Sequence, residues 1–155
     1  MRTIAQFALA LACAALAPAP AGWAATTGKT TKQDGKMITV HAILITASNK
    51  KGGVDRKLAA YADNLKSNLP FDTFHYATEG RASLHEGGRG TITFAGDHRL
   101  ELEDDPEKGI HLKVFWLKGP ETIISATLTL NPGVPAVLVR RGGGDEVPVV
   151  ILVAR

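Results

Sequence analysis

The sequence predicts an α+β fold, in which a strand and a helix are followed by about seven mostly antiparallel strands. Three observations support this prediction. Turn-forming residues recur at intervals of about ten residues after residue 70, a spacing typical of meanders, sandwiches and barrels. Apolar and polar residues alternate between most of these turns. Only the segment 55–67 repeats its apolar residues at helical spacing, so a single helix is expected to cover the sheet.

The first 24 residues have the features of a secretory signal peptide. Arg2 supplies a positive start, Ile4 to Leu16 are nearly all apolar, and small residues precede an expected cleavage between Ala24 and Ala25. The apolar run is shorter than the roughly 20 residues that a membrane-spanning helix needs. We therefore expect cleavage, export to the periplasm or beyond, and no membrane span in the mature chain.

The composition after cleavage indicates one domain without disulfides. Residues 25–36 are rich in Thr, Gly and Lys and predict a flexible linker, followed by a single domain at 37–155. The only cysteine, Cys13, lies in the predicted leader. A chain of this length can bury an adequate core without disulfides.

The charge of the chain is mildly positive and evenly distributed. Lys and Arg number 18 and Asp and Glu 15, which gives a formal net charge of +3. Nucleic-acid-binding domains usually concentrate basic residues on one face, and this chain shows no such cluster. We therefore expect no nucleic-acid partner.

The individual elements follow from local patterns. The strand at 37–47 is apolar on both parities, so both of its faces should be covered. Asp55 is a suitable N-cap for the helix at 55–67. Further strands are expected at 71–79 with a continuation at 82–85, and then at 91–95, 98–103, 110–117, 122–130, 136–140 and 147–154. The last of these is the most apolar and is expected inside a sheet.

Two small groups of residues are candidate binding positions. Arg140 and Arg141 begin a glycine-rich turn and are suited to bind an anionic partner. Phe115 and Leu117 lie on the parity opposite to Trp116, on the outer face of their strand. A second covering layer is the favoured interpretation of these two apolar residues, and a partner-binding patch is the alternative.

No catalytic residues are predicted, because nucleophile and acid–base motifs are lacking in the sequence. An alternative function is a metal-binding protein or metal-dependent hydrolase, with His85, Glu86 and His98 as ligands. A small-molecule carrier is a third interpretation and requires an apolar cavity. No cofactor is expected for the favoured function.

Two segments carry a resemblance to other proteins: HAILITASNKKGGVDRKLAAYADNLKSNLPFDTFHY at 41–76 and TLTLNPGVPAVLV at 127–139. In these the chain resembles a group of uncharacterised exported bacterial proteins with no assigned activity. The resemblance implies a setting in the envelope of a Gram-negative bacterium. The resemblance adds no functional residues. Because acid–base, nucleophile and metal motifs are lacking while strands and turns are well specified, we expect a non-enzymatic binding or assembly module that recognises an envelope protein at an exposed sheet edge, offered by the strand at 37–47 or that at 71–79.

Overall fold

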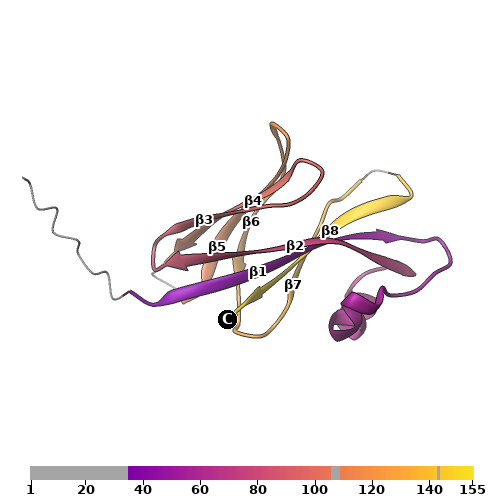
Figure 1. Ribbon diagram of the computed structural model, residues 1–155, viewed down its shortest axis with the longest axis horizontal. Coiled ribbons are helices and arrows are strands. Elements are labelled where there is room, and N and C mark those ends of the chain that lie inside the picture. Colours follow the sequence, from indigo (N-terminus) through magenta and orange to yellow (C-terminus); the bar gives the residue numbers. More distant parts are fainter. Residues whose placement is uncertain (1–34, 106–108, 143) are drawn as a thin grey trace, which may run out of the picture. The chain divides into compact units, whose positions relative to one another are not determined.

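The structure, a computed structural model, describes residues 35–105, 109–142 and 144–155. Within this part of the chain, eight strands form two antiparallel sheets, and a short helical segment follows the first strand (Figure 1). The elements are β1 (Met37–Ser48), the 3₁₀ helix η1 (Arg56–Tyr61), α1 (Ala62–Asn68), β2 (Thr73–His85), β3 (Arg89–Thr93), β4 (His98–Asp105), β5 (His111–Lys118), β6 (Glu121–Thr129), β7 (Ala136–Val139) and β8 (Glu146–Ala154).

The first sheet has the strand order β2-β1-β8-β7, and the second has the order β3-β4-β5-β6. The chain thus crosses to the second sheet after β2 and returns after β6, and its last strand pairs with its first. The fold is broadly α+β, as predicted, but it contains more β structure than the prediction described.

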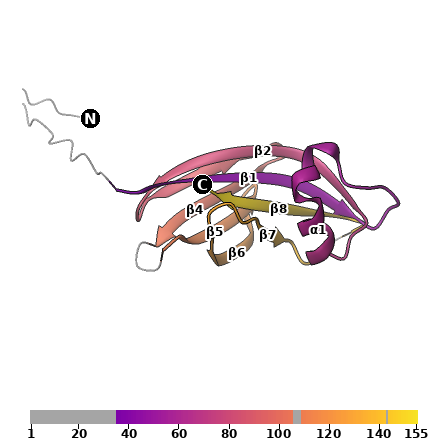
Figure 2. The ribbon, with the colours of Figure 1, turned by 90° about the horizontal axis from the view of Figure 1, so that it is seen from below.

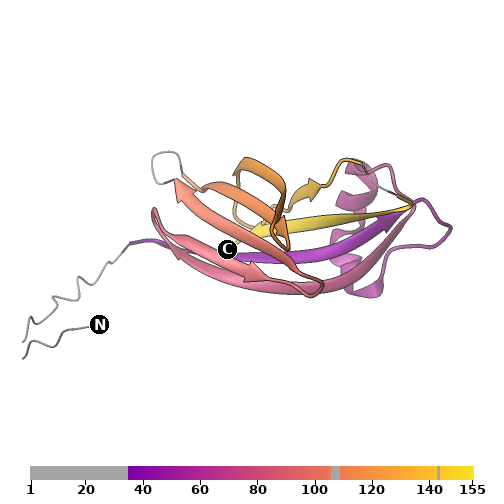
Figure 3. The ribbon, with the colours of Figure 1, turned by 90° about the horizontal axis from the view of Figure 1, so that it is seen from above.

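The first sheet lies between the second sheet and the helical segment. Side chains of β1 and β8 point alternately to two apolar clusters, so both strands are covered on both faces, as predicted. The interior position of β8 is also confirmed. Figure 2 shows α1 in front of the first sheet, and Figure 3 shows it behind that sheet.

The second sheet buries one face only. Alternate residues of β4 and β5 are almost completely buried against the first sheet, which agrees with the alternation in the sequence. The residues that form this inner layer are Leu100, Leu102, Leu112, Val114 and Trp116.

The predicted helix at 55–67 is present as two short pieces, η1 and α1. Asp55 caps the segment, because its Oδ1 accepts a hydrogen bond of 3.1 Å from the N–H of Lys57. Leu58 and Leu65 are buried against the first sheet. Leu58 and Tyr61 are three residues apart, and in a 3₁₀ helix such residues lie on the same side. Residues 56–61 are thus wound more tightly than the predicted α-helix, and both side chains pack toward the sheet.

The prediction that the first strand offers an exposed edge is wrong, because β1 lies between β2 and β8. Its apolar residues on both parities favour this interior position. The alternative strand, β2, does form an edge of the first sheet. The segment before η1 already pairs with the beginning of that edge. The N–H of Phe74 donates to the carbonyl of Gly53, and the carbonyl of Phe74 accepts from the N–H of Asp55.

The predicted signal peptide at 1–24 and most of the predicted linker at 25–36 lie outside the described residues. In the part of the chain that the structure describes, no helix is both long enough and apolar enough to cross a membrane.

Candidate functional site

A groove with a volume of about 640 Å³ lies between the segment that follows α1 and the edge strand β7. One wall consists of Leu69, Pro70 and Phe71, which follow the helix directly. The opposite wall is formed by valines of β7 and β8, namely Val137, Val139 and Val147. The groove thus lies along the β7 edge of the first sheet, and we call it the β7 groove.

Both predicted binding arginines line the β7 groove. Arg140 and Arg141 follow the last residue of β7 and are half-buried and exposed, respectively. Among the described residues, no carboxylate forms an ion pair with either side chain. Both arginines therefore border an apolar groove, and neither has an acidic ion-pair partner among the described residues. The charge of Arg140 also reaches His98 on the second sheet.

Strand β7 also presents unpaired backbone groups beside the groove. The N–H of Arg140 points to the carbonyl of Pro148 on β8 at 3.5 Å. Because hydrogen-bonding direction alternates along an antiparallel strand, the N–H and C=O groups of Val137 and Val139 point away from β8. These groups lie at the edge of the sheet, where no described strand pairs with them. The edge can therefore accept an added strand.

The other two predicted binding residues lie on the outer face of the second sheet. Phe115 and Leu117 are half-buried, and the cross-strand neighbours of Phe115 are Glu101 and Ser125. The favoured interpretation, a covering layer, is not what the structure has in its described part: the helical segment packs on the first sheet instead. On this outer face, charged side chains of β4 lie directly beside both apolar residues: Glu101 is paired with Phe115 and Arg99 with Leu117.

The three residues of the predicted metal site are not brought together. His85 ends β2, and Glu86 is in the turn that follows, whereas His98 begins β4 at the far end of the β3–β4 hairpin. The length of β3 separates them, about 13 Å for a strand that rises roughly 3.3 Å per residue. Within the described ranges, no group of three His, Cys, Asp or Glu side chains is close enough to hold a metal ion.

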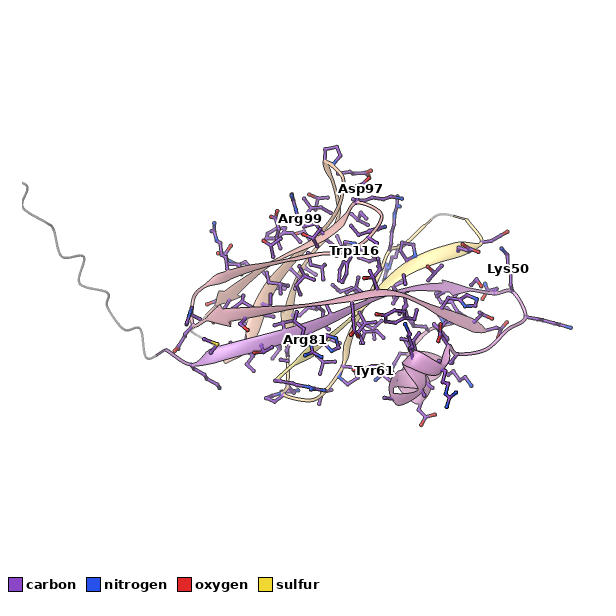
Figure 4. The ribbon with its side chains drawn as sticks, viewed as in Figure 1. Lys50, Tyr61, Arg81, Asp97, Arg99 and Trp116 are labelled. Atoms are coloured by element: carbon purple, nitrogen blue, oxygen red, sulfur yellow. The ribbon has the colours of Figure 1, made fainter. Side chains whose placement is uncertain are left out.

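His98 has a structural partner instead. Its Nδ1 lies 3.0 Å from the indole nitrogen of Trp116, which donates the hydrogen bond. Burial lowers the pKa of His98, and the positive charges of Lys118 and Arg140 lower it further, while Asp97 opposes them. The sequence placed Trp116 correctly on the inner face, and Figure 4 labels this side chain. Nothing in the sequence spacing identified His98 as its acceptor.

The described structure is therefore a pair of packed antiparallel sheets with one covering helical segment and an arginine-bordered groove at an open sheet edge. Comparisons of the chain with protein-family models, with curated proteins and with solved structures gave no match.

Proposed function

We propose that this chain is a non-enzymatic binding or assembly module of the bacterial envelope, which holds an extended segment of a partner protein at the β7 groove. The observation that carries this proposal is a combination found within the described residues: a strand edge that no other strand pairs with, an apolar groove beside it, and two arginines without an ion-pair partner. The leader-like residues 1–24 support the exported location.

The mode of recognition follows from the direction of the free backbone N–H and C=O groups of β7. A partner strand added at this edge receives backbone hydrogen bonds from Val137 and Val139. Side chains on one face of that strand then lie over the groove, because successive side chains of a strand alternate between its two faces. The partner segment is thus expected to carry apolar residues at every second position.

The two arginines define the charge of the partner. Guanidinium groups form strong, often bidentate hydrogen bonds with carboxylates. Arg140 and Arg141 follow the paired part of β7, so a carboxylate just beyond the apolar positions of the added strand is within their range. We therefore propose an acidic residue at one end of the bound segment.

A capture experiment with matched charge variants tests this proposal. The purified protein is immobilised, exposed to an envelope extract of a Gram-negative bacterium, and its bound proteins are identified by mass spectrometry. We expect a defined set of partners that the double variant Arg140→Glu and Arg141→Glu no longer binds. Hydrogen exchange at the amides of Val137 and Val139 is expected to slow when the partner is bound.

The matched control is the double variant Arg81→Glu and Lys113→Glu, which makes the same change in net charge at exposed positions of β2 and β5. Arg81 lies on the opposite edge strand of the first sheet, three strand spacings or about 14 Å from β7. The control is expected to bind the same partners as the original chain. The proposal would be contradicted if the groove variant still bound the same proteins, or if both double variants lost them equally.

A further inference from the structure

Strand β6 is an edge strand whose second half lacks the features that usually prevent edge-to-edge pairing. It is the last strand of the second sheet and pairs with β5 on one side only, within the described residues. Its nine residues, ETIISATLT, contain no proline, and their only charge is that of Glu121 at the start. Natural sheets normally protect such edges with charges, prolines or bulges.

The single irregularity of this strand lies near its beginning. The register between β5 and β6 shifts between Trp116 and Leu117, which leaves Ile123 without a direct partner. From Ile124 to Thr129 the ladder is regular. This second half of β6 is therefore the part that can pair with another strand.

The unpaired backbone groups of this segment can be assigned. The N–H of Leu130 donates to the carbonyl of Ile110 on the β5 side at 2.9 Å. Hydrogen-bonding direction alternates along an antiparallel strand. The N–H and C=O groups of Ser125, Thr127 and Thr129 therefore point away from β5, and their side chains are exposed on the outer face of the sheet.

We propose that β6 pairs with β6 of a second copy of this chain, antiparallel, around a two-fold axis at Thr127. In this register Thr127 lies opposite the partner's Thr127, and Ser125 lies opposite the partner's Thr129. All these residues carry outward-pointing backbone groups, so the ladder is complete. The second sheet of one copy and the second sheet of the other copy then form one continuous sheet.

The composition of β6 favours a second copy over an unrelated partner. In the proposed register, core-facing residues lie opposite core-facing residues. Ala126 lies opposite the partner's Leu128, and both side chains pack against the core in their own copy. Glu121 lies outside the paired segment, so no like charges oppose each other. The β7 groove, in contrast, carries positive charges that select an acidic partner. Association at β6 does not depend on the function proposed for that groove.

Sedimentation velocity over a series of concentrations tests the proposal. The paired segment is short, so we expect a weak dimer whose fraction grows with concentration. Thr127→Lys and Thr127→Glu each place like charges opposite one another at the axis, and each variant is expected to lose the dimer. An equimolar mixture of the two variants is expected to regain it, since Lys then lies opposite Glu.

Two further variants separate this interface from general effects on folding. Thr127→Val keeps the strand neutral and is expected to dimerise as the original chain does. Thr91→Lys makes the same charge change at an exposed position of β3, the other edge of the second sheet, and is also expected to dimerise. The proposal is overturned if the original chain is monomeric throughout the series, if Thr127→Lys dimerises normally, or if the mixture of folded charge variants stays monomeric.

Discussion

The indole N–H of Trp116 donates a hydrogen bond to Nδ1 of His98, with 3.0 Å between the two nitrogens. The two rings are also in contact, with centroids 5.6 Å apart. Trp116 is fully buried between the sheets, so its N–H has no access to water and needs an acceptor. Because Nδ1 accepts, the proton of neutral His98 is on Nε2, and protonation of the ring would remove the acceptor.

This pair makes the stability of the fold dependent on pH. The pKa of His98 is lowered from its ordinary value of 6.5, first by burial and then by Lys118 and Arg140. Above about pH 6.5 the residue is neutral in both the folded and the unfolded chain, and the fold has its full stability. As the pH falls, the unfolded chain binds the proton first. Stability is therefore lost between pH 6.5 and the lowered pKa of the folded state.

The measurement is the free energy of unfolding in urea at several pH values between about 5 and 8. The variant His98→Gln keeps an oxygen that can accept from Trp116 but does not titrate. We expect the original chain to lose more stability on acidification than this variant does. Equal slopes for the two proteins would show that His98 is not responsible.

Gly80 allows the first and second sheets to approach closely where β2 faces β3. A Cβ at this position would overlap Cγ2 of Ile92, which is itself 2% exposed and has no room to move. Gly80→Ala is therefore expected to destabilise the fold by about 1–3 kcal/mol, the range for overpacked cores.

A double-mutant cycle with Ile92→Ala measures this contact. Removal of the isoleucine side chain makes space for the new methyl group, so the two substitutions together should cost less than the sum of their separate effects. Thermal or urea unfolding of the four proteins supplies the energies. Additive effects would mean that the glycine is needed for another reason.

Asp104 holds the turn between β2 and β3 from inside the fold. The residue is 4% exposed, and its Oδ2 accepts a hydrogen bond of 2.9 Å from the N–H of Gly87. Its own N–H donates to the carbonyl of Gly88, also at 2.9 Å. We expect Asp104→Ala to destabilise the fold by about 2 kcal/mol, since the N–H of Gly87 loses its carboxylate acceptor. Asp104→Asn keeps an acceptor oxygen, and calorimetry should show a smaller loss for it.

Asp55 joins the helical segment to the edge of β2. One carboxylate oxygen accepts from the N–H of Lys57 at 3.1 Å, and the other lies 3.4 Å from the backbone nitrogen of Tyr76. Asp55→Ala is expected to cost about 1–2 kcal/mol, as for other lost N-caps. The exposed Asp63 of α1 provides the control, because Asp63→Ala should change the unfolding free energy little. Similar losses for both variants would exclude a specific role of the cap.

Much of the fold was predictable because it depends on local periodicity. The alternation from Leu112 to Trp116 identified the buried face of β5, and the apolar runs of β1 and β8 identified strands covered on both sides. The position of Asp55 before a helical repeat identified the N-cap. The 3₁₀ winding of residues 56–61 was not predictable, because apolar residues three apart share a face in both an α-helix and a 3₁₀ helix.

The candidate site was predictable only in part. The sequence identified Arg140 and Arg141 as cations beside a glycine-rich turn, but the groove that they line also includes Leu69 and Phe71, about 70 residues earlier in the chain. No local pattern connects these positions. The same limit applied to His85 and His98, which lie near each other in the sequence but at opposite ends of β3.

The sequence by itself thus determined which residues form strands, which face of each strand is apolar and where the charged turns lie. These properties follow from the alternation of side chains along a strand, which needs no knowledge of the partner element. Only the tertiary structure decided that β2 and not β1 is an edge, which surface stayed open beside β7, and which acceptor serves Trp116. The physical reason is that these relations join residues far apart in the chain, and the packing of the two sheets sets them.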